Sequence, residues 1–236
     1  MIGIIAAMDK EIKTLLKAMT IDKTDIIANK SFYRGFLGSQ EVVVTQSGIG
    51  KVNAAMTTTI LLMSYPIDYL INTGVAGGLF PVNSGDIIVS EGVVYSDVDV
   101  QKIDPELPYG QMPGDPFIVY ADARLVSQAK DLLKERKLCY RSGIIASGDQ
   151  FITDSIKLAP IQSVVNDLYA VEMESMAIAM TAMKFHIPFV IFRGISDVID
   201  DTLQVQMYEN TVEDIADLTA DFVIQYVERY PWKPLM

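Results

Sequence analysis

Four acidic residues stand where apolar, strand-like segments of the sequence end: Glu11, Glu172, Glu174 and Asp197. The carboxyl ends of parallel strands share one rim of a sheet, so we expect these side chains to lie close together. Two carboxyl groups in one cleft can act as general acid and general base. Glycine turns at 48–50 and 74–78 would let a ligand approach the backbone there. The pattern predicts acid–base chemistry on a polar, uncharged substrate with an apolar end.

Residue types exclude other common catalytic arrangements. His186 is the only histidine, so neither a Ser-His-Asp triad nor a histidine-rich metal site can form. Cys139 is the only cysteine, which excludes an internal disulfide and a thiolate metal cluster. The turn at 48–53 matches neither a dinucleotide-binding fingerprint nor a Walker A loop. We expect no metal and no cofactor, a structural role for His186 at a helix end, and a small buried side chain in Cys139.

Each candidate residue also has a purely structural interpretation. Glu11 and Glu174, taken singly, are acids that a helix dipole favours in the first turn. Asp197 could cap a helix, and Arg193 could serve only to neutralise a carboxylate. The nearby apolar residues, Met8, Phe151 and Met173, are core residues by default. The joint placement of all four acids beside glycine turns is what favours a site.

The elements that must position these residues alternate between strand and helix. Helical spacing predicts helices over 9–19, 51–64, 122–136, 173–186 and 207–230. Short apolar runs predict strands over 2–7, 41–45, 68–73, 141–146, 167–171 and 187–194. We expect one α/β domain over residues 1–236, a three-layer αβα arrangement around a mixed, mostly parallel twisted sheet. The segment 96–116, rich in Pro, Gly and Asp, is a candidate binding loop or lid.

One of these helices has a clear apolar stripe. Its members recur at steps of three and four: Val52, Ala55, Met56, Thr59, Ile60 and Met63. The stripe predicts an amphipathic helix over 51–64.

Composition limits the partners. The 236 residues are 50% hydrophobic, enough for a sizeable core, and carry a net charge of −11. Phosphates would repel such a chain, so we expect no nucleic-acid partner. The N-terminus lacks a basic region ahead of its short apolar run, and no uncharged apolar run approaches a membrane span. We expect a cytoplasmic protein with no membrane partner.

Seven segments occur in the order seen in one family and together span most of the chain: 4–11, 47–52, 72–78, 109–114, 147–152, 171–174 and 193–198. They resemble the 5′-methylthioadenosine/S-adenosylhomocysteine nucleosidases of the purine nucleoside phosphorylase superfamily. The resemblance implies a nucleoside phosphorylase-like fold and a homodimer. It also implies hydrolysis of the N-glycosidic bond of 5′-methylthioadenosine and S-adenosylhomocysteine, and of 5′-deoxyadenosine as well. Adenine release of this kind would serve methionine salvage and remove a by-product of methyl transfer.

The resemblance also implies roles for individual residues. Asp197, held by Ser196, would protonate adenine N7, and Glu11 would activate the attacking water. Glu174 would accept hydrogen bonds from the ribose hydroxyls, and Phe151 would stack on adenine. The other implied substrate contacts are Met8, Ile49, Ala76, Gly77, Ile152 through its backbone, Glu172, Met173, Arg193 and Met207. Val100 and Pro113 are further candidates for the pocket of the 5′ substituent.

Three departures from the family pattern concern the 5′ substituent and the water. Val75 stands where many members carry Ser, and Met207, followed by Tyr208, stands where an aromatic residue commonly closes the pocket. The loop 103–108 lacks the usual aromatic residues. Three alternatives stay open: a phosphorylase on the same fold, a hydrolase of another purine nucleoside such as a futalosine derivative, and a non-catalytic nucleoside-binding protein. The Val75 departure bears on the second of them.

Overall fold

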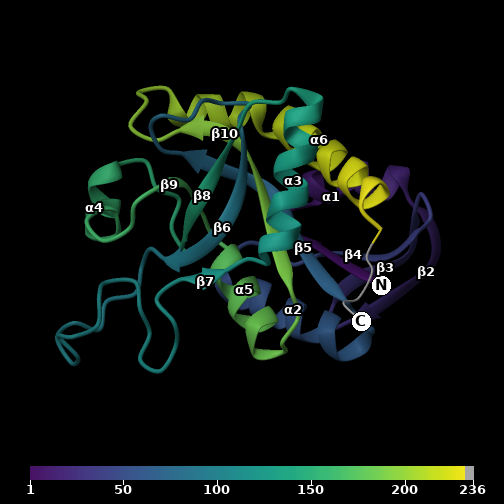
Figure 1. Ribbon diagram of the computed structural model, residues 1–236, viewed down its shortest axis with the longest axis horizontal. Coiled ribbons are helices and arrows are strands. Elements are labelled where there is room, and N and C mark those ends of the chain that lie inside the picture. Colours follow the sequence, from purple (N-terminus) through teal and green to yellow (C-terminus); the bar gives the residue numbers. More distant parts are fainter. Residues whose placement is uncertain (232–236) are drawn as a thin grey trace.

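The computed structural model describes residues 1–231, in which ten strands form one mixed sheet flanked by helices (Figure 1). The strands are β1 (Ile2–Ala6), β2 (Thr20–Ile27), β3 (Lys30–Leu37), β4 (Gln40–Gln46), β5 (Tyr69–Gly78), β6 (Ile87–Tyr95), β7 (Val119–Tyr120), β8 (Tyr140–Ser147), β9 (Leu168–Glu172) and β10 (Phe189–Val198). The helices are α1 (Asp9–Ala18), α2 (Lys51–Ser64), α3 (Ala123–Arg136), the 3₁₀ turn η1 (Ser155–Leu158), α4 (Ala159–Gln162), α5 (Ser175–Lys184) and α6 (Gln204–Arg229).

The sheet closes partly on itself. Its strand order is β10-β6-β8-β9-β5-β1-β4-β3-β2, and β10 also pairs with β5, so β10, β6, β8, β9 and β5 form a ring. The expected α/β domain with a mixed sheet is confirmed, but parallel pairings do not dominate. Within residues 1–231, β1–β4, β1–β5, β5–β10, β6–β8 and β8–β9 are parallel, and five further pairings are antiparallel. The ring brings the ends of β5, β9 and β10 together.

Helices cover both faces of the sheet (Figure 1). On one face α1, α3 and α6 enclose a core that includes Leu15, Leu133 and Phe222. On the other face α2 and α5 enclose a second core around Leu61 and Met176. Helix α5 is apolar on nearly all sides and is buried along most of its length, as its sequence predicts.

Most of the apolar stripe of α2 faces away from the core, and only Ala55 and Ile60 pack partly against it. Val52 is 80% exposed and Met63 is 73% exposed, whereas Ala54 and Leu61 are fully buried. Ala54 and Leu61 pack on the sheet through the opposite side of the helix. The helix therefore has two apolar sides, and one of them is open in the single chain.

Several features were not predicted by the sequence pattern. Strand β2 is almost wholly exposed and so has no apolar alternation to indicate it. Strand β6 contains an irregularity between Ser90 and Gly92, which interrupts its pairing with β8. Cys139 is exposed rather than buried, because it lies in the turn between α3 and β8. His186 does lie at a helix end, just after α5, with a φ of 57°. Among residues 1–231, no helix combines the length and the apolar character that crossing a membrane requires.

Aromatic packing holds the C-terminal half of α6 against the first half of β10. The rings of Phe192 and Phe222 meet edge to face with centroids 5.0 Å apart, and Tyr226 contacts both. We expect Phe222→Ala to lower the free energy of unfolding by about 3–5 kcal/mol, because it leaves a cavity in this cluster. Urea denaturation measures it. Tyr120→Ala, at a side chain 68% exposed on β7, serves as control and should change stability by less than about 0.5 kcal/mol. Equal effects of the two substitutions would contradict this account of α6 packing.

Candidate active site

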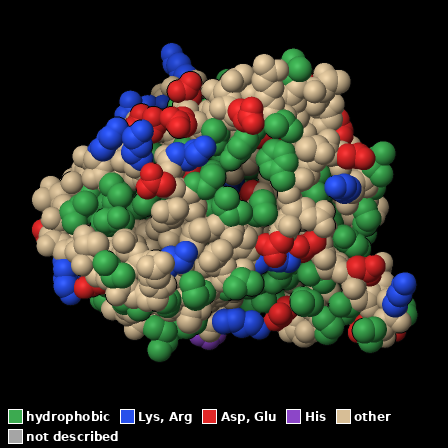
Figure 2. Space-filling view, turned by 180° about the vertical axis from the view of Figure 1, so that it is seen from behind, with side chains coloured by type: hydrophobic (Ala, Val, Ile, Leu, Met, Phe, Trp, Pro, Cys, Tyr) green, Lys and Arg blue, Asp and Glu red, His purple; other side chains and the backbone are tan. Residues whose placement is uncertain are grey.

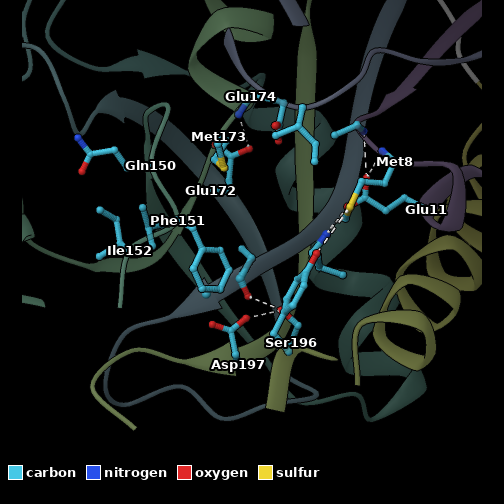
Figure 3. Close-up of a pocket in the computed structure, with 17 residues that line it drawn as sticks. Met8, Glu11, Gln150, Phe151, Ile152, Glu172, Met173, Glu174, Ser196 and Asp197 are labelled. Carbon is cyan, nitrogen blue, oxygen red and sulfur yellow. Dashed lines mark hydrogen bonds between the residues drawn. The ribbon is translucent and has the colours of Figure 1, made fainter. Parts of the chain in front are cut away.

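A cavity of about 320 Å³ opens where β1, β5, β9 and β10 end (Figure 3). Its lining residues are Ala7, Met8, Glu11, Ile49, Val75, Ala76, Gly77, Gln150, Phe151, Ile152, Val171, Glu172, Met173, Glu174, Ser196, Asp197 and Tyr208. All four acids singled out in the sequence are among them. The volume suits a small organic ligand.

Glu11 reaches the cavity from the first turn of α1 and is held by backbone groups. Its Oε2 accepts hydrogen bonds from the N–H groups of Ala7 and Met8, at 3.0 and 2.8 Å, and its Oε1 accepts one from Val75 at 2.9 Å. The side chain is only 2% exposed. Glu11 therefore does lie in the first turn of a helix, as the structural interpretation of the sequence suggested. The same carboxylate also lines the cavity.

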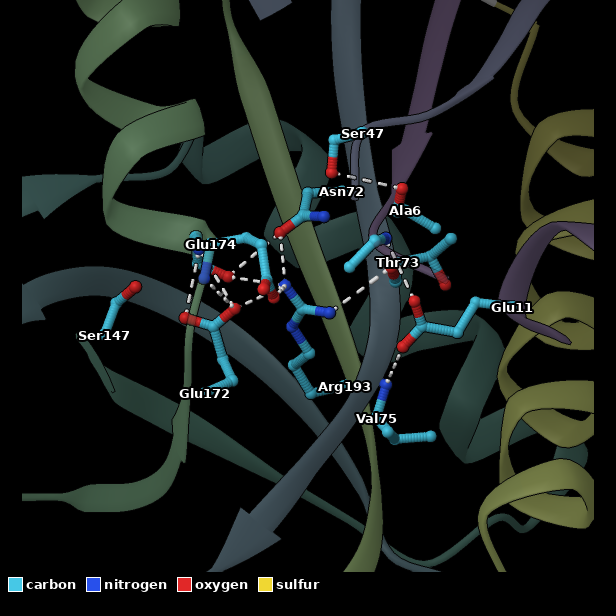
Figure 4. A network of polar contacts seen from close by, with 12 residues as sticks. Ala6, Glu11, Ser47, Asn72, Thr73, Val75, Ser147, Glu172, Glu174 and Arg193 are labelled. Carbon is cyan, nitrogen blue, oxygen red and sulfur yellow. Dashed lines mark hydrogen bonds and ion pairs between the residues drawn. The ribbon is translucent and has the colours of Figure 1, made fainter. Parts of the chain in front are cut away.

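Glu172 and Glu174 come from one tight turn but have different partners (Figure 4). Glu172 accepts hydrogen bonds from the backbone N–H groups of Glu174 and Ser175 at the start of α5, and it pairs with Arg193 at 2.6 Å. Glu174 accepts one hydrogen bond, from the N–H of Gly50 at 2.8 Å, and its other oxygen lies 4.0 Å from Arg193. Glu172 is therefore largely committed to the helix and to Arg193, while Glu174 keeps hydrogen-bonding capacity for a ligand.

Arg193 is fully buried and does not line the cavity. Its guanidinium also donates to the Asn72 side chain at 2.7 Å and to Ser175 Oγ at 3.0 Å. Gly74 lies against it, since a Cβ there would clash with Arg193 Nη1 and Glu11 Oε1. Arg193 thus interacts with the carboxylates on the side away from the cavity. Gly74, which has no side chain, leaves room for Arg193 and Glu11 to approach each other.

Burial changes the acidity of two of these carboxyl groups. Desolvation raises the pKa of Glu11, although Arg193 and three backbone N–H groups act against the rise. Desolvation, followed by repulsion from Glu172, raises the pKa of Glu174 to about 8. Both groups therefore hold a proton more readily than an exposed glutamate does, which suits proton transfer near neutral pH.

Asp197 lies within β10, not at a helix start, so it is not a helix cap. It is 1% exposed, and each carboxylate oxygen accepts a hydrogen bond. The Ser196 hydroxyl donates to Oδ1 at 2.6 Å, and the Gln204 side-chain amide donates to Oδ2 at 2.7 Å. The carboxylate is therefore fixed in orientation at the cavity wall.

The cavity is closed by apolar side chains, as the resemblance implies, with one shift of position. Phe151 and Tyr208 pack edge to face with ring centroids 5.5 Å apart. The Tyr208 hydroxyl lies 3.7 Å from Met8 Sδ. Met207, the residue expected from the sequence, is absent from the lining, because the geometry of α6 turns its neighbour Tyr208 inward. The loop 96–116, with Val100 and Pro113, contributes no lining residue in the single chain.

An ion-pair cluster braces the two turns at the cavity edge. Lys51 pairs with Asp97 at 2.7 Å, and the N–H groups of Lys51 and Asp149 donate to Asp149 and Asp97 respectively. The cluster joins the start of α2, next to Gly50, to the segment that carries Phe151. Sequence reasoning missed these contacts and also Gln204, because each joins segments far apart in the chain and no local spacing indicates it.

The sequence and the fold are similar to those of known proteins. A family model described as the phosphorylase superfamily matches residues 1–228, which gives the class of protein that the fold and site define. The 5′-methylthioadenosine/S-adenosylhomocysteine nucleosidase of Bacillus licheniformis is 40% identical over 97% of this chain and 98% of its own length. The chain belongs to the family of 5′-methylthioadenosine/S-adenosylhomocysteine nucleosidases.

Solved structures show the same likeness in three dimensions. The nucleosidase of Neisseria meningitidis, in complex with methylthio-immucillin-A, superposes with a TM-score of 0.91 at 33% identity, covering 97% of this chain and 99% of that one. The futalosine hydrolase of Helicobacter pylori superposes with a TM-score of 0.90 at 28% identity, covering 97% of each chain. The fold is thus shared by enzymes named for different nucleosides.

The acidity of Glu174 predicts how stability depends on pH. The folded chain holds a proton on Glu174 up to about pH 8, whereas an unfolded chain releases it near the ordinary value of 4.5. The folded state therefore binds more protons over this range, and its stability falls as pH rises through it. We expect Tm to fall between about pH 5 and pH 8 without ligand, and to fall less steeply in Glu174→Gln.

The matched control for this pH series is Glu209→Gln, at an exposed position of α6, which should keep the wild-type slope. Differential scanning calorimetry at matched ionic strength measures both variants. A wild-type slope in Glu174→Gln would contradict the assigned acidity.

Proposed function

We propose that the chain hydrolyses the N-glycosidic bond of 5′-methylthioadenosine and S-adenosylhomocysteine, releasing adenine and the 5′-thio-substituted ribose. The observation that carries the proposal is the charge of the cavity. Its lining contains four acidic side chains and neither Lys nor Arg. The nearby Arg193 lies outside the lining and is bound to Asn72 and Glu172. Such a cavity favours a neutral nucleoside, and it favours the positive charge that its sugar gains as the C1′–N9 bond breaks.

Asp197 acts as the general acid. Adenine departs readily only when N7 is protonated, and Asp197 supplies this proton from the cavity wall. The hydrogen bonds from Ser196 and Gln204 hold its carboxyl group in one orientation. As the bond breaks, the proton passes from Asp197 to N7, and the bonding electrons go to the base.

Glu11 acts as the general base. It takes a proton from the water that attacks C1′, so that the sugar gains a hydroxyl group. The three backbone N–H groups on Glu11 fix its position, and its raised pKa lets it accept a proton near neutral pH. Val75, which donates one of these N–H groups, brings no hydroxyl of its own to the water.

Glu174 binds the ribose hydroxyl groups. It lies next to Met173 in the lining, and its carboxyl group keeps hydrogen-bonding capacity for these hydroxyl groups beyond the one bond that it accepts from Gly50. Glu172 contributes mainly by holding Arg193 and the start of α5.

The base and the 5′ substituent lie against different apolar residues of the lining. Phe151 stacks on adenine, the Ile152 backbone hydrogen-bonds its edge, and Ala76 with Gly77 lies beside it. Met8, Ile49 and Tyr208 surround the alkylthio group. The Tyr208 hydroxyl, which donates to the Met8 sulfur, gives this part of the lining a polar group.

A second candidate function rests on two observations. Val75 departs from the family pattern, and the fold is shared with a futalosine hydrolase, so another purine nucleoside, such as a futalosine derivative, is the alternative substrate. Phosphorolysis is disfavoured, because an anionic phosphate would enter a cavity lined by carboxylates without a facing cation.

We also propose that residues 1–236 act as one domain and that two copies form a homodimer through α2. Val52, Met56 and Met63 form an exposed apolar stripe on α2, and Ile49, which lines the cavity, is 53% exposed just before this helix. Hydrophobic side chains also gather around a hollow on the face turned away in Figure 1 (Figure 2). An exposed apolar stripe of this kind is typical of an interface, and a partner there would cover the alkylthio end of the cavity.

The acid–base assignment predicts the effect of two isosteric substitutions. Glu11→Gln and Asp197→Asn remove proton transfer without changing side-chain size. Each should lower kcat for methylthioadenosine by at least about 10²-fold, measured as adenine release by chromatography. Glu209→Gln, at an exposed position that does not line the cavity, should keep wild-type turnover. Turnover in Asp197→Asn close to that of the wild type would refute the assigned mechanism.

The dimer proposal predicts the effect of charge on α2. We expect the wild-type chain to sediment at twice its mass of 26.1 kDa, and Met56→Glu/Met63→Glu to sediment as a monomer with a raised KM. Ile156→Glu, at a side chain 75% exposed on η1, should remain a dimer. A monomeric wild type at micromolar concentration would overturn the proposal.

A further inference from the structure

Gln204 is a buried glutamine at the start of α6, where its neighbours are exposed. Only 3% of the residue is accessible, whereas Val205 is 53% exposed and Gln206 is also exposed. Long polar side chains in a first helical turn ordinarily extend into solvent. The burial of Gln204 therefore needs a specific reason.

Two acceptors account for its orientation. The side-chain Nε2 donates to Asp197 Oδ2 at 2.7 Å and to the carbonyl oxygen of Ile152 at 2.9 Å. Both N–H bonds of the amide are thus used, and only the nitrogen end can face two acceptors. The Oε1 atom is buried and has no hydrogen-bond partner within residues 1–231. The two donated hydrogen bonds therefore hold the amide in this orientation despite the cost of an unpaired acceptor.

These two acceptors belong to the two parts of the site that handle the base. Asp197 is the leaving-group acid, and the Ile152 backbone lies in an irregular segment, 151–154, beside Phe151. The Ile152 carbonyl receives no other hydrogen bond within the described chain. One rigid, planar amide therefore sets the distance between the acid and the segment that reads the base.

We propose that Gln204 is a positioning residue for adenine release: it holds Asp197 and the Ile152 carbonyl as one unit, so that the acid meets N7 when the base is seated. The proposal rests on the proposed nucleosidase function. Gln204 contacts no reacting atom and is not in the cavity lining, so it acts through Asp197 and Ile152. Its contribution should therefore be larger in kcat than in KM.

Gln204→Met tests the proposal, because methionine keeps the length and bulk of the side chain and removes both donors. We expect kcat for methylthioadenosine to fall by about tenfold to a hundredfold, the usual effect of losing a hydrogen bond to a charged group. KM should change less than threefold. Gln206→Met, an exposed residue in the same helical turn, is the matched control and should keep wild-type kinetics.

A second substrate separates positioning of the acid from a general structural effect. A 5-methylthioriboside with 4-nitrophenolate as leaving group departs without protonation, so Gln204→Met should hydrolyse it at the wild-type rate. A loss of equal size on both substrates would overturn the proposal, and so would unchanged kcat for methylthioadenosine. If the wild type releases no adenine from methylthioadenosine, it is the proposed function that fails.

Gln204→Glu provides an independent variant. Above neutral pH its carboxylate faces that of Asp197 and repels it, so kcat should fall below that of Gln204→Met. As pH decreases toward 5 the new carboxyl group gains a proton and can donate again, so the deficit relative to wild type should shrink. A deficit that is independent of pH would contradict the donor role of Gln204.

Discussion

The buried guanidinium of Arg193 is the interaction on which the rest of the site depends. It pairs with Glu172, donates to Asn72 and Ser175, and lies near Glu174, all without contact with solvent. Several carboxylates cannot be buried together in the absence of a compensating cation, since each uncompensated charge costs several kcal/mol. Arg193 comes from β10 and its partners come from β5 and the β9–α5 turn. The cation therefore holds together the strands whose ends form the cavity.

In this arrangement one of the four acids has a structural role, and the other three remain available to a ligand. Glu172 uses its oxygens on Arg193 and on the N-terminus of α5, which anchors the turn that presents Glu174. Glu11, Glu174 and Asp197 each accept hydrogen bonds on the protein side while also lining the cavity. Apolar side chains such as Met8 and Phe151 complete the wall. Desolvation then raises the pKa of Glu11 and Glu174, so the same burial that Arg193 makes possible also tunes the acids for proton transfer.

Most of the site could be predicted from the sequence, because buried strands are recognisable as short apolar runs. The acids come directly after these runs, at the carboxyl ends of the strands. Glu11 at the start of α1, Glu172 and Glu174 just before α5, and the Ser196-Asp197 pair near the end of β10 all lie at the edge of the sheet where we expected them. Sequence reasoning did not reveal the ring closure between β5, β9 and β10, which depends on pairings between distant segments. The sequence pattern led us to expect Met207 in the lining, where the structure has Tyr208. Successive side chains along a helix point about 100° apart, so the two neighbours cannot face the cavity together. The α2 stripe was detected, but its exposure in the single chain depends on which of two apolar sides packs on the sheet.

The central claim is that water, activated by Glu11, is the nucleophile in a cavity that lacks a facing cation. Adenine release from methylthioadenosine, followed by chromatography with the purified wild-type chain in phosphate-free buffer and again with added phosphate, tests this most directly. We expect the same rate in both buffers and free 5-methylthioribose as the second product. Adenine release that requires phosphate, with 5-methylthioribose 1-phosphate as the second product, would contradict it.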